Sequence, residues 1–180
     1  MISIFLSYPQ PHMQEQRRFI DTITNSLKTK SIAPRTLGVT DYDTDSPLAA
    51  IRRLMLESDG FITVALRRTY IQNGTKKMNA DLEEVQTQKI KGQWFTSPYC
   101  QIEAAMAYQL GLPILTLREE GVIAEGILEK GVVGSYLPEF NLSNISKDYM
   151  ETDEWKQAMS KWEADVRIVN KKKGYPNQLY

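Results

Sequence analysis

Short runs of apolar residues alternate along the chain with longer stretches of helical periodicity. The run Ile2 to Ser7 is stopped by a Tyr-Pro-Gln-Pro segment, which is typical of a buried first strand. Apolar residues at helical spacing then predict an amphipathic helix from about Gln14 to Lys28. Phe61 to Leu66 and Pro113 to Leu117 are further apolar runs of strand length. The pattern therefore predicts at least three buried strands.

Helices are predicted between these strands. Ser46-Pro47 and Ser97-Pro98 are helix-start signatures, and they predict helices from Pro47 to Glu57 and from Tyr99 to Leu110. Ser31 to Pro34 is a short second strand, Gly121 to Gly131 holds another short helix, and Val132 to Tyr136 is a last strand. Alternation of this kind implies right-handed crossovers. The expected fold is α/β, a flavodoxin-like doubly wound parallel sheet of about five strands in three layers.

The chain divides into a main domain and a C-terminal helix. Residues 1–145 form the α/β domain, and within it residues 70–96 are a polar insertion or lid, with helical propensity from Ala80 to Lys91. Residues 146–180 hold an amphipathic helix begun by Thr152 or Asp153. Its apolar stripe either packs on the domain or serves as an oligomer contact. The stripe consists of Trp155, Met159, Trp162, Val166 and Val169.

Composition narrows the chemistry. Lys plus Arg and Asp plus Glu both number 22, so the net charge is zero and we expect neither a nucleic-acid nor a membrane partner. The N-terminus lacks the basic region of a signal peptide, and we expect a cytoplasmic protein. One cysteine and one histidine, Cys100 and His12, argue against zinc and histidine-centred sites, so no metal is expected. No glycine-rich nucleotide motif follows any strand, and we expect no bound cofactor.

Ligands of open parallel sheets bind beyond the carboxyl ends of the strands. That rule selects Ser7 and Tyr8, the polar loop Arg35 to Asp45, the pair Arg67 and Arg68, and the loop that runs into the Ser97 helix. Within that helix Glu103 shares a line with Tyr99, Met106, Ala107 and Leu110. Burial among such neighbours would raise the pKa of its carboxyl, although an ordinary surface glutamate is the other interpretation.

Several segments together resemble the bacterial Toll/interleukin-1 receptor (TIR) family. They are Phe5-Leu6-Ser7-Tyr8, the aspartate-rich loop before a helix, the strand after Ser58-Asp59-Gly60, and Ser97 to Glu103 followed by Gly111-Leu112-Pro113-Ile114. The resemblance covers about residues 2 to 140. Its most telling part is Cys100-x-x-Glu103, which is similar to the segment that carries the catalytic glutamate of TIR enzymes.

This resemblance implies cleavage of the bond between nicotinamide and ribose in NAD, as NAD glycohydrolase or ADP-ribosyl cyclase, in bacterial antiphage defence. NAD is then the substrate, Glu103 is catalytic, and self-association through the Asp41 to Asp45 loop controls the site. Tyr8 or Trp94 would stack on a ring, and Arg35, Arg67 or Arg68 would bind phosphate. The substrate-binding residues expected are Ser7, Tyr8, Arg35, Asp45, Arg67, Trp94, Tyr99 and Cys100.

Two other functions stay open. Nucleoside 2-deoxyribosyltransferases share the expected fold and a glutamate in a similar helix, so an N-glycosidase in which Glu103 is the nucleophile is one alternative. A non-catalytic TIR adaptor that binds a partner effector protein is the other. The segment from Tyr70 to Gln93 is longer and more polar than the family pattern, and Trp94-Phe95-Thr96 replaces a short approach to the glutamate helix.

Overall fold

Four parallel strands form the central sheet of the computed structural model, which describes residues 1–133, 139–144 and 149–172. The strands are β1 (Ile2–Ser7), β2 (Ile32–Arg35), β3 (Phe61–Ala65) and β8 (Ile114–Arg118). Their order in the sheet is β2-β1-β3-β8, and every neighbouring pair is parallel. The chain crosses from one side of β1 to the other between β2 and β3. This topology confirms the expected flavodoxin-like, doubly wound α/β fold.

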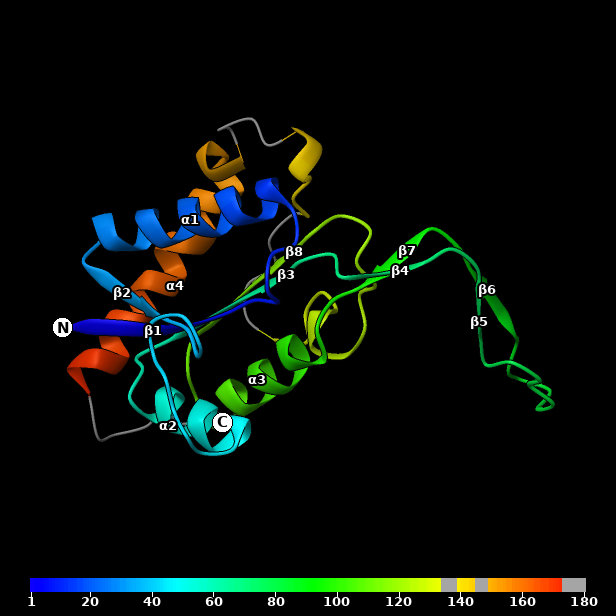
Figure 1. Cartoon of the computed structure of the whole chain (residues 1–180), viewed down its shortest axis with the longest axis horizontal. Helices are drawn as coiled ribbons and strands as arrows, with labels where there is room; N and C mark the ends of the chain where they lie inside the picture. Colours follow the sequence, from blue (N-terminus) through cyan, green and yellow to red (C-terminus); the bar gives the residue numbers. More distant parts are fainter. Residues whose placement is uncertain (134–138, 145–148, 173–180) are drawn as a thin grey trace.

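Helices cover both faces of the sheet and complete three layers (Figure 1). Helices α1 (Gln14–Thr29) and α4 (Asp153–Lys171) bury their apolar side chains on one face. Helices α2 (Pro47–Leu56) and α3 (Pro98–Gln109) pack on the other. Because both faces are covered, the sheet strands are apolar along nearly their whole length. The two predicted Ser-Pro helix starts are confirmed, since Ser46 and Ser97 are the N-cap residues of α2 and α3.

Between β8 and α4 the described residues hold only short fragments of regular structure. One short 3-10 helix, η1 (Gly126–Leu128), replaces the helix expected between Gly121 and Gly131, and two others are η2 (Leu142–Asn144) and η3 (Tyr149–Glu151). A parallel bridge joins Glu119 to Phe140 beside β8. The last strand expected over Val132 to Tyr136 is wrong at its start, because Val132 lies in a turn and Val133 in a bend; its remainder lies outside the described residues.

The polar segment after β3 forms a two-part β-hairpin, called the arm here and comprising residues 67–96. Strands β4 (Thr69–Ile71) and β7 (Gln93–Phe95) pair at its root, and β5 (Gly74–Lys76) and β6 (Gln88–Ile90) pair further out. The arm projects away from the body rather than folding over it (Figure 1). The helix expected between Ala80 and Lys91 is therefore wrong. That segment has no apolar stripe to bury, and the β5–β6 pairing satisfies its backbone instead.

The tryptophan stripe of α4 is part of the core. Thr152 caps the helix by accepting a hydrogen bond from the backbone N–H of Trp155 at 3.2 Å. Trp155, Met159, Trp162 and Val166 are all buried together with apolar side chains of α1 and the sheet. The indole N–H of Trp162 donates to the carbonyl of Pro113 at 3.0 Å. These four residues of the stripe thus pack on their own domain, and Val169 is only partly buried.

Gly60 allows α4 to lie this close to the sheet. A Cβ at this position would stand 2.5 Å from Cγ2 of Val166 and 3.3 Å from both Ile4 and Trp162. Gly60 directly precedes β3, so its backbone cannot move without moving a central strand. The absence of a side chain here is therefore a packing requirement.

We expect Gly60→Ala to destabilise the fold by about 1–3 kcal/mol, the usual cost of overpacking a rigid core. Urea unfolding followed by circular dichroism measures this change. Val166→Ala in the same chain should recover part of the loss, because it removes the methyl group that the new Cβ would meet. Additive losses in the double variant would contradict the assignment.

Candidate active site

A row of hydroxyl side chains crosses the sheet near its carboxyl edge. Ser7 on β1 is in register with Thr63 on β3, and Thr63 is in register with Thr116 on β8. Two residues earlier the equivalent row is apolar, with Phe5, Phe61 and Ile114 facing α2 and α3. Side chains of a strand alternate between faces, so the hydroxyl row also points toward α3. The apolar packing between sheet and helix gives way here to polar groups.

Helix α3 places two functional groups above this row. It begins at Ser97, whose side-chain oxygen accepts from the backbone N–H of Tyr99 at 3.3 Å, and Pro98 occupies its first turn. The buried side of the helix carries Cys100, Glu103, Ala104 and Ala107. Small alanines let the helix approach the sheet closely, which brings the longer Glu103 side chain onto the strand end.

Glu103 and Ser7 form a buried pair at the centre of the site. The Ser7 hydroxyl donates a hydrogen bond to Oε2 of Glu103. Glu103 is only 8% exposed, although glutamate is almost never buried without a partner. Burial raises the pKa of its carboxyl to about 7, and the hydrogen bond from Ser7 acts in the opposite direction. The expected rise in pKa follows from this geometry, and near neutral pH both protonation states of Glu103 are populated.

Cys100 lies one helical turn before Glu103 and is itself buried. Burial raises the pKa of the Cys100 thiol, so the thiolate needed for nucleophilic attack is disfavoured. Its sulfur lies 3.7 Å from Oγ1 of Thr96, the residue that joins the arm to α3. Cys100 therefore packs beneath the carboxylate and is not placed to react.

Two hydroxyls of the row were not expected from sequence. The side-chain oxygens of Thr63 and Thr116 are buried and have no hydrogen-bond partner among the residues that the structure describes. A buried hydroxyl without a partner is costly, and such groups concentrate where a structure serves function. The signal was present as a polar residue in the middle of each apolar strand, but only strand register places the three side by side.

Tyr8 lines a cavity of about 590 Å³ on the α1 side of the same edge. Its phenol is half-buried, and burial raises its pKa. Arg17 and Asp21 of α1 supply opposite charges to the cavity wall, and Thr36 supplies a hydroxyl. The lining residues are Tyr8, Gln10, Pro11, Arg17, Ile20, Asp21, Thr36, Leu37, Gly38 and Val39. The arrangement offers an aromatic face, ionic groups and a hydroxyl within one recess.

Arg67 and Trp94 meet at the root of the arm. The Arg67 guanidinium lies over the Trp94 ring, 5.9 Å from its centroid. Its Nε donates to the carbonyl of Glu120 at 2.6 Å and lies 3.7 Å from Oε1 of Glu119. Glu119 is buried, burial raises the pKa of its carboxyl, and it also accepts from Gln16 and from the Arg67 backbone. Arg67 is thus held by a structural network.

Arg35 is likewise engaged, which differs from its expected role in phosphate binding. Its guanidinium pairs with Asp41 at 2.6 Å and with Glu57 at 2.8 Å. The hydrogen bond from Arg35 lowers the pKa of the Asp41 carboxyl. The pairing fastens the loop after β2 to the end of α2.

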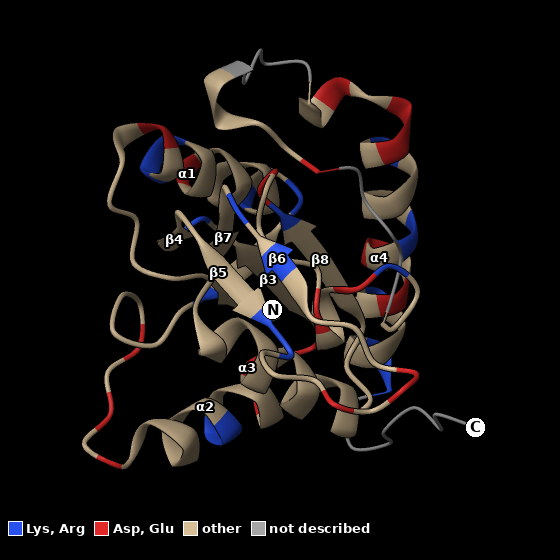
Figure 2. Ribbon diagram, turned by 90° about the vertical axis from the view of Figure 1, so that its right-hand side faces the viewer, with Lys and Arg blue, Asp and Glu red and all other residues tan. Residues whose placement is uncertain are grey.

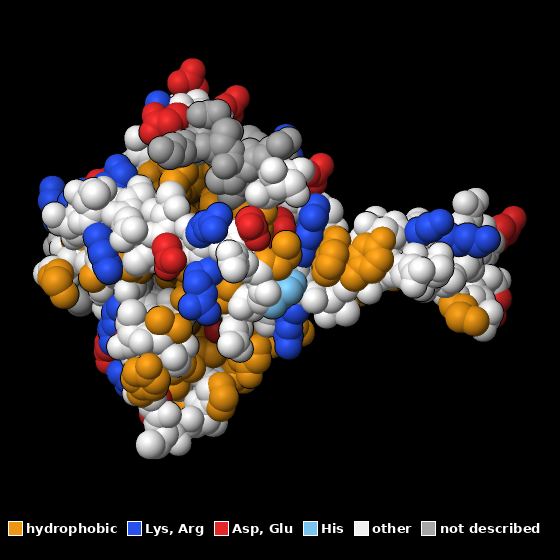
Figure 3. Space-filling view, turned by 45° about the horizontal axis from the view of Figure 1, so that its top comes forward, with side chains coloured by type: hydrophobic (Ala, Val, Ile, Leu, Met, Phe, Trp, Pro, Cys, Tyr) orange, Lys and Arg blue, Asp and Glu red, His pale blue; other side chains and the backbone are white. Residues whose placement is uncertain are grey.

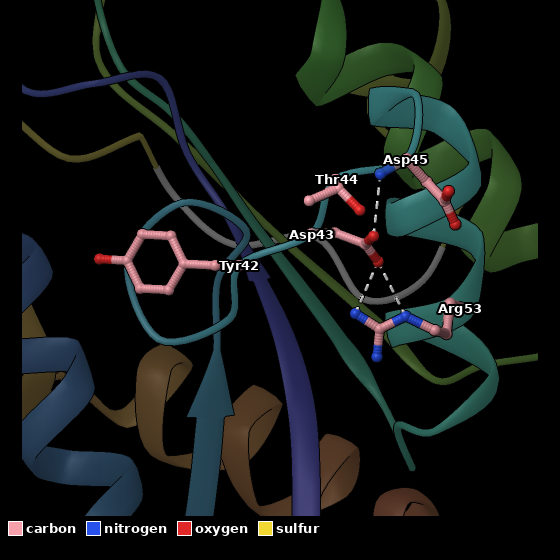
Figure 4. Close-up of a pocket in the computed structure, with 5 residues that line it drawn as sticks. All are labelled: Tyr42, Asp43, Thr44, Asp45 and Arg53. Atoms are coloured by element: carbon pink, nitrogen blue, oxygen red, sulfur yellow. Dashed lines mark hydrogen bonds and ion pairs between the residues drawn. The ribbon is translucent and has the colours of Figure 1, made fainter.

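Asp45 and Tyr99 stand apart from the buried pair. Asp45 lies with Tyr42, Asp43, Thr44 and Arg53 around a surface pocket, and Figure 4 shows its carboxylate turned away from the Asp43–Arg53 ion pair. Tyr99, one turn before Glu103 on α3, is 42% exposed and is not among the buried residues of the helix. Of the expected residues, the structure brings Ser7, Cys100 and Glu103 together.

Among the described residues, no three His, Cys, Asp or Glu side chains lie close enough together to hold a metal ion. Residues 1–133, 139–144 and 149–172 also contain no helix with the length and apolar character needed to cross a membrane. The arrangement consists of one carboxylate with a pKa near neutrality and hydroxyls beside it on the α3 face, with the Tyr8 recess on the α1 face of the same edge. Such a group can stabilise a developing cation or exchange a proton.

Fold and site together define a doubly wound α/β domain with a buried carboxylate at the carboxyl edge of its sheet. No family model matches the chain, and no curated protein matches its sequence. Among solved structures it is similar to the CMP N-glycosidase BcmB of Clostridium botulinum, with a TM-score of 0.44, 16% identity, and coverage of 72% of this chain and 79% of that one.

It is also similar to the TIR domains of the activated Roq1 resistosome that recognises the pathogen effector XopQ. That superposition has a TM-score of 0.41 and 13% identity, and it covers 94% of this chain and 84% of that chain. Both similarities concern the fold alone.

The raised pKa of Glu103 makes stability depend on pH in a defined direction. Its native pKa of about 7 exceeds the ordinary 4.5, so the native state holds a proton that the unfolded state releases between these values. Glu103 therefore contributes stability below pH 4.5 that is lost as pH rises through 7, by about 3 kcal/mol in total. Denaturant unfolding from pH 5 to 8 should show this fall in the wild type and not in Glu103→Gln.

The exposed Glu129 provides a matched control, since Glu129→Gln removes a carboxylate without touching the buried pair. This variant should keep the wild-type pH dependence. An unchanged slope in Glu103→Gln would mean that the carboxyl titrates as a solvated group.

Proposed function

We propose that this protein cleaves the N-glycosidic bond between nicotinamide and ribose in NAD, by hydrolysis or by cyclisation to an ADP-ribose product. The observation that carries the proposal is the buried Glu103 carboxyl, paired with Ser7 at the carboxyl edge of a parallel sheet. The resemblance of Ser97 to Glu103 to the glutamate segment of TIR enzymes supports the same assignment.

The chemistry of this bond suits a single carboxylate. When the bond between C1′ and the pyridinium nitrogen breaks, both electrons go to the nitrogen, and nicotinamide leaves as a neutral molecule that needs no proton. Positive charge then develops on the ribose ring. An ionised Glu103 stabilises that charge electrostatically, and a preorganised charge in a desolvated site is worth far more than in water. Water or a nitrogen of the substrate's own adenine then attacks C1′ and loses a proton.

The observed hydrogen bond indicates how the ribose would be held. Ser7 donates to Glu103 in the structure, and a ribose hydroxyl can donate to the same carboxylate oxygen. The displaced Ser7 hydroxyl would then turn to the substrate as a second polar contact. Thr63, buried beside Ser7 without a partner in the described part of the chain, supplies a further hydroxyl. Tyr8, which follows Ser7 in the chain, lines the recess at the α1 side of the same edge and would offer an aromatic face to a ring of the dinucleotide.

A second candidate follows from the pKa of about 7. In its protonated form Glu103 can act as a general acid toward a departing neutral nucleobase, which leaves more readily once protonated. This favours an N-glycosidase that acts on nucleosides or nucleotides. A general acid must be protonated, whereas a charge that stabilises the ribose cation must be ionised, so pH separates these two roles. A nucleophilic Glu103, the role considered from the sequence, would also be ionised and is identified instead by a covalent sugar adduct.

Purified protein at high concentration should release nicotinamide from NAD, and chromatography measures the nicotinamide that is released. We expect Glu103→Gln to lower kcat by roughly 10²–10³-fold, the usual effect of removing a charge that stabilises a transition state. Glu129→Gln should retain wild-type activity. The mass of the second product separates hydrolysis from cyclisation.

The pH profile provides the further criterion. NAD cleavage by the carboxylate should increase with pH and level off above about 7. Activity on a nucleoside monophosphate that instead falls through this pH, with no nicotinamide release, would replace the first candidate by the second. Inactivity of the wild type on both substrate classes would refute enzymatic cleavage at this site.

A further inference from the structure

Basic and acidic residues occupy different parts of the arm. Its two strand segments, residues 67–77 and 88–96, contain no aspartate or glutamate. Their cations are Arg67, Arg68, Lys76, Lys77, Lys89 and Lys91. The acidic residues of the arm are confined to its tip, at Asp81, Glu83 and Glu84. Figure 2, seen along the arm, shows the basic residues on β5 and β6.

Most of these cations are available to a ligand. Arg67 pairs with Glu119, and Lys76 pairs with Glu125. Arg68, Lys77 and the Lys89–Lys91 pair form no ion pair with any residue that the structure describes. Unpaired cations this close together repel one another, and a polyanion relieves the repulsion.

Aromatic side chains lie on the same ribbon, close to its root. Tyr70 is 52% exposed and Phe95 is 43% exposed. Tyr70 and Trp94 face each other across β4 and β7 with ring centroids 4.8 Å apart. Figure 3 shows apolar side chains near the root of the arm and basic side chains further out. Because Tyr70 is paired with Trp94 and Thr69 with Phe95, Tyr70 and Phe95 lie on opposite faces of the ribbon, so each face exposes one ring near the root. Exposed rings and unpaired cations on one ribbon favour a ligand that carries both flat bases and phosphates.

We propose that the arm binds single-stranded nucleic acid, with Lys89 and Lys91 on phosphates and Tyr70 and Phe95 stacking on bases. An acidic protein surface could pair with the lysines but would give the exposed rings nothing to stack on. A second copy of the chain would need a large apolar contact, whereas the outer strands carry mostly amides, hydroxyls and lysines. A two-stranded ribbon with so little buried surface is itself marginally stable, and a bound strand would order it.

The arm is directly connected to the catalytic helix. Strand β7 ends at Phe95, Thr96 contacts the sulfur of Cys100, and Glu103 follows one turn later. A ligand that fixes the root of the arm would therefore also fix the start of α3. This coupling, unlike the binding itself, rests on the proposed function, and it makes nucleic acid an activator of the site.

Binding is measured with a fluorescein-labelled 20-nucleotide oligo-dT and the full-length protein, by anisotropy, without NAD. Three to four phosphate contacts predict that affinity falls by roughly 20- to 50-fold between 50 and 200 mM salt. Lys89→Gln with Lys91→Gln should weaken binding and reduce the salt slope by about 1.4. Tyr70→Ala with Phe95→Ala should weaken binding at least about fivefold and leave the slope unchanged.

Lys161→Gln with Lys171→Gln removes two exposed cations of α4 and is the matched control, which should bind as the wild type does. Absence of oligonucleotide binding at 50 mM salt would overturn the proposal. The proposal would also be overturned if polyglutamate bound as tightly as the oligonucleotide and the aromatic variants left its binding unchanged. That result would point to an acidic protein as the partner. Sedimentation that shows a dimer lost with the lysine variants, without oligonucleotide binding, would point to a second copy.

Nicotinamide release with and without oligo-dT tests the coupling separately. Stimulation that disappears in the lysine variant supports activation through the arm, and unchanged release contradicts it. If oligonucleotide binds while NAD is never cleaved, the proposed function fails and the binding site stands.

Discussion

The parallel sheet must be covered on both faces, and this constraint organises the molecule. Strands β1, β3 and β8 bury apolar side chains on both sides, so α1 and α4 must close one face while α2 and α3 close the other. Toward the carboxyl edge Ser7, Thr63 and Thr116 interrupt the apolar side chains on the α3 face, and beyond them Ala65 packs with Val122 and Leu128. The candidate site lies where the apolar packing is interrupted.

Burial of Glu103 follows from the same constraint. Because α3 packs closely on the sheet, its inward side chain cannot reach bulk water, and the nearest polar group is the hydroxyl of Ser7. Desolvation raises the pKa of the carboxyl to about 7, into the range in which proton exchange is possible at neutral pH. Structure and chemistry are thus coupled, since the packing that stabilises the fold also sets the protonation of the candidate catalytic group.

Local charge and total charge have different consequences in this protein. A net charge of zero predicted no nucleic-acid partner, because a global field needs a global excess. The arm, however, carries four cations that form no ion pair with any described residue, while Arg67 and Lys76 pair with Glu119 and Glu125 of the body and the arm's own acids lie at its tip. Binding depends on the field near the ligand, because charges more than about a Debye length away are largely screened. The basic residues therefore share one ribbon only once the chain has folded into the hairpin.

The sequence by itself determined the layered fold, because strand and helix periodicity and the two Ser-Pro starts are local signals that burial reinforces. It also singled out Glu103 and Ser7. It misplaced the arm as partly helical, since propensity without an apolar stripe is a weak guide. Only the tertiary structure decided that Ser7 meets Glu103, that Thr63 joins them, and that Arg35 is held by Asp41 and Glu57. These contacts join residues far apart in the chain or depend on strand register and desolvation, which no local pattern encodes.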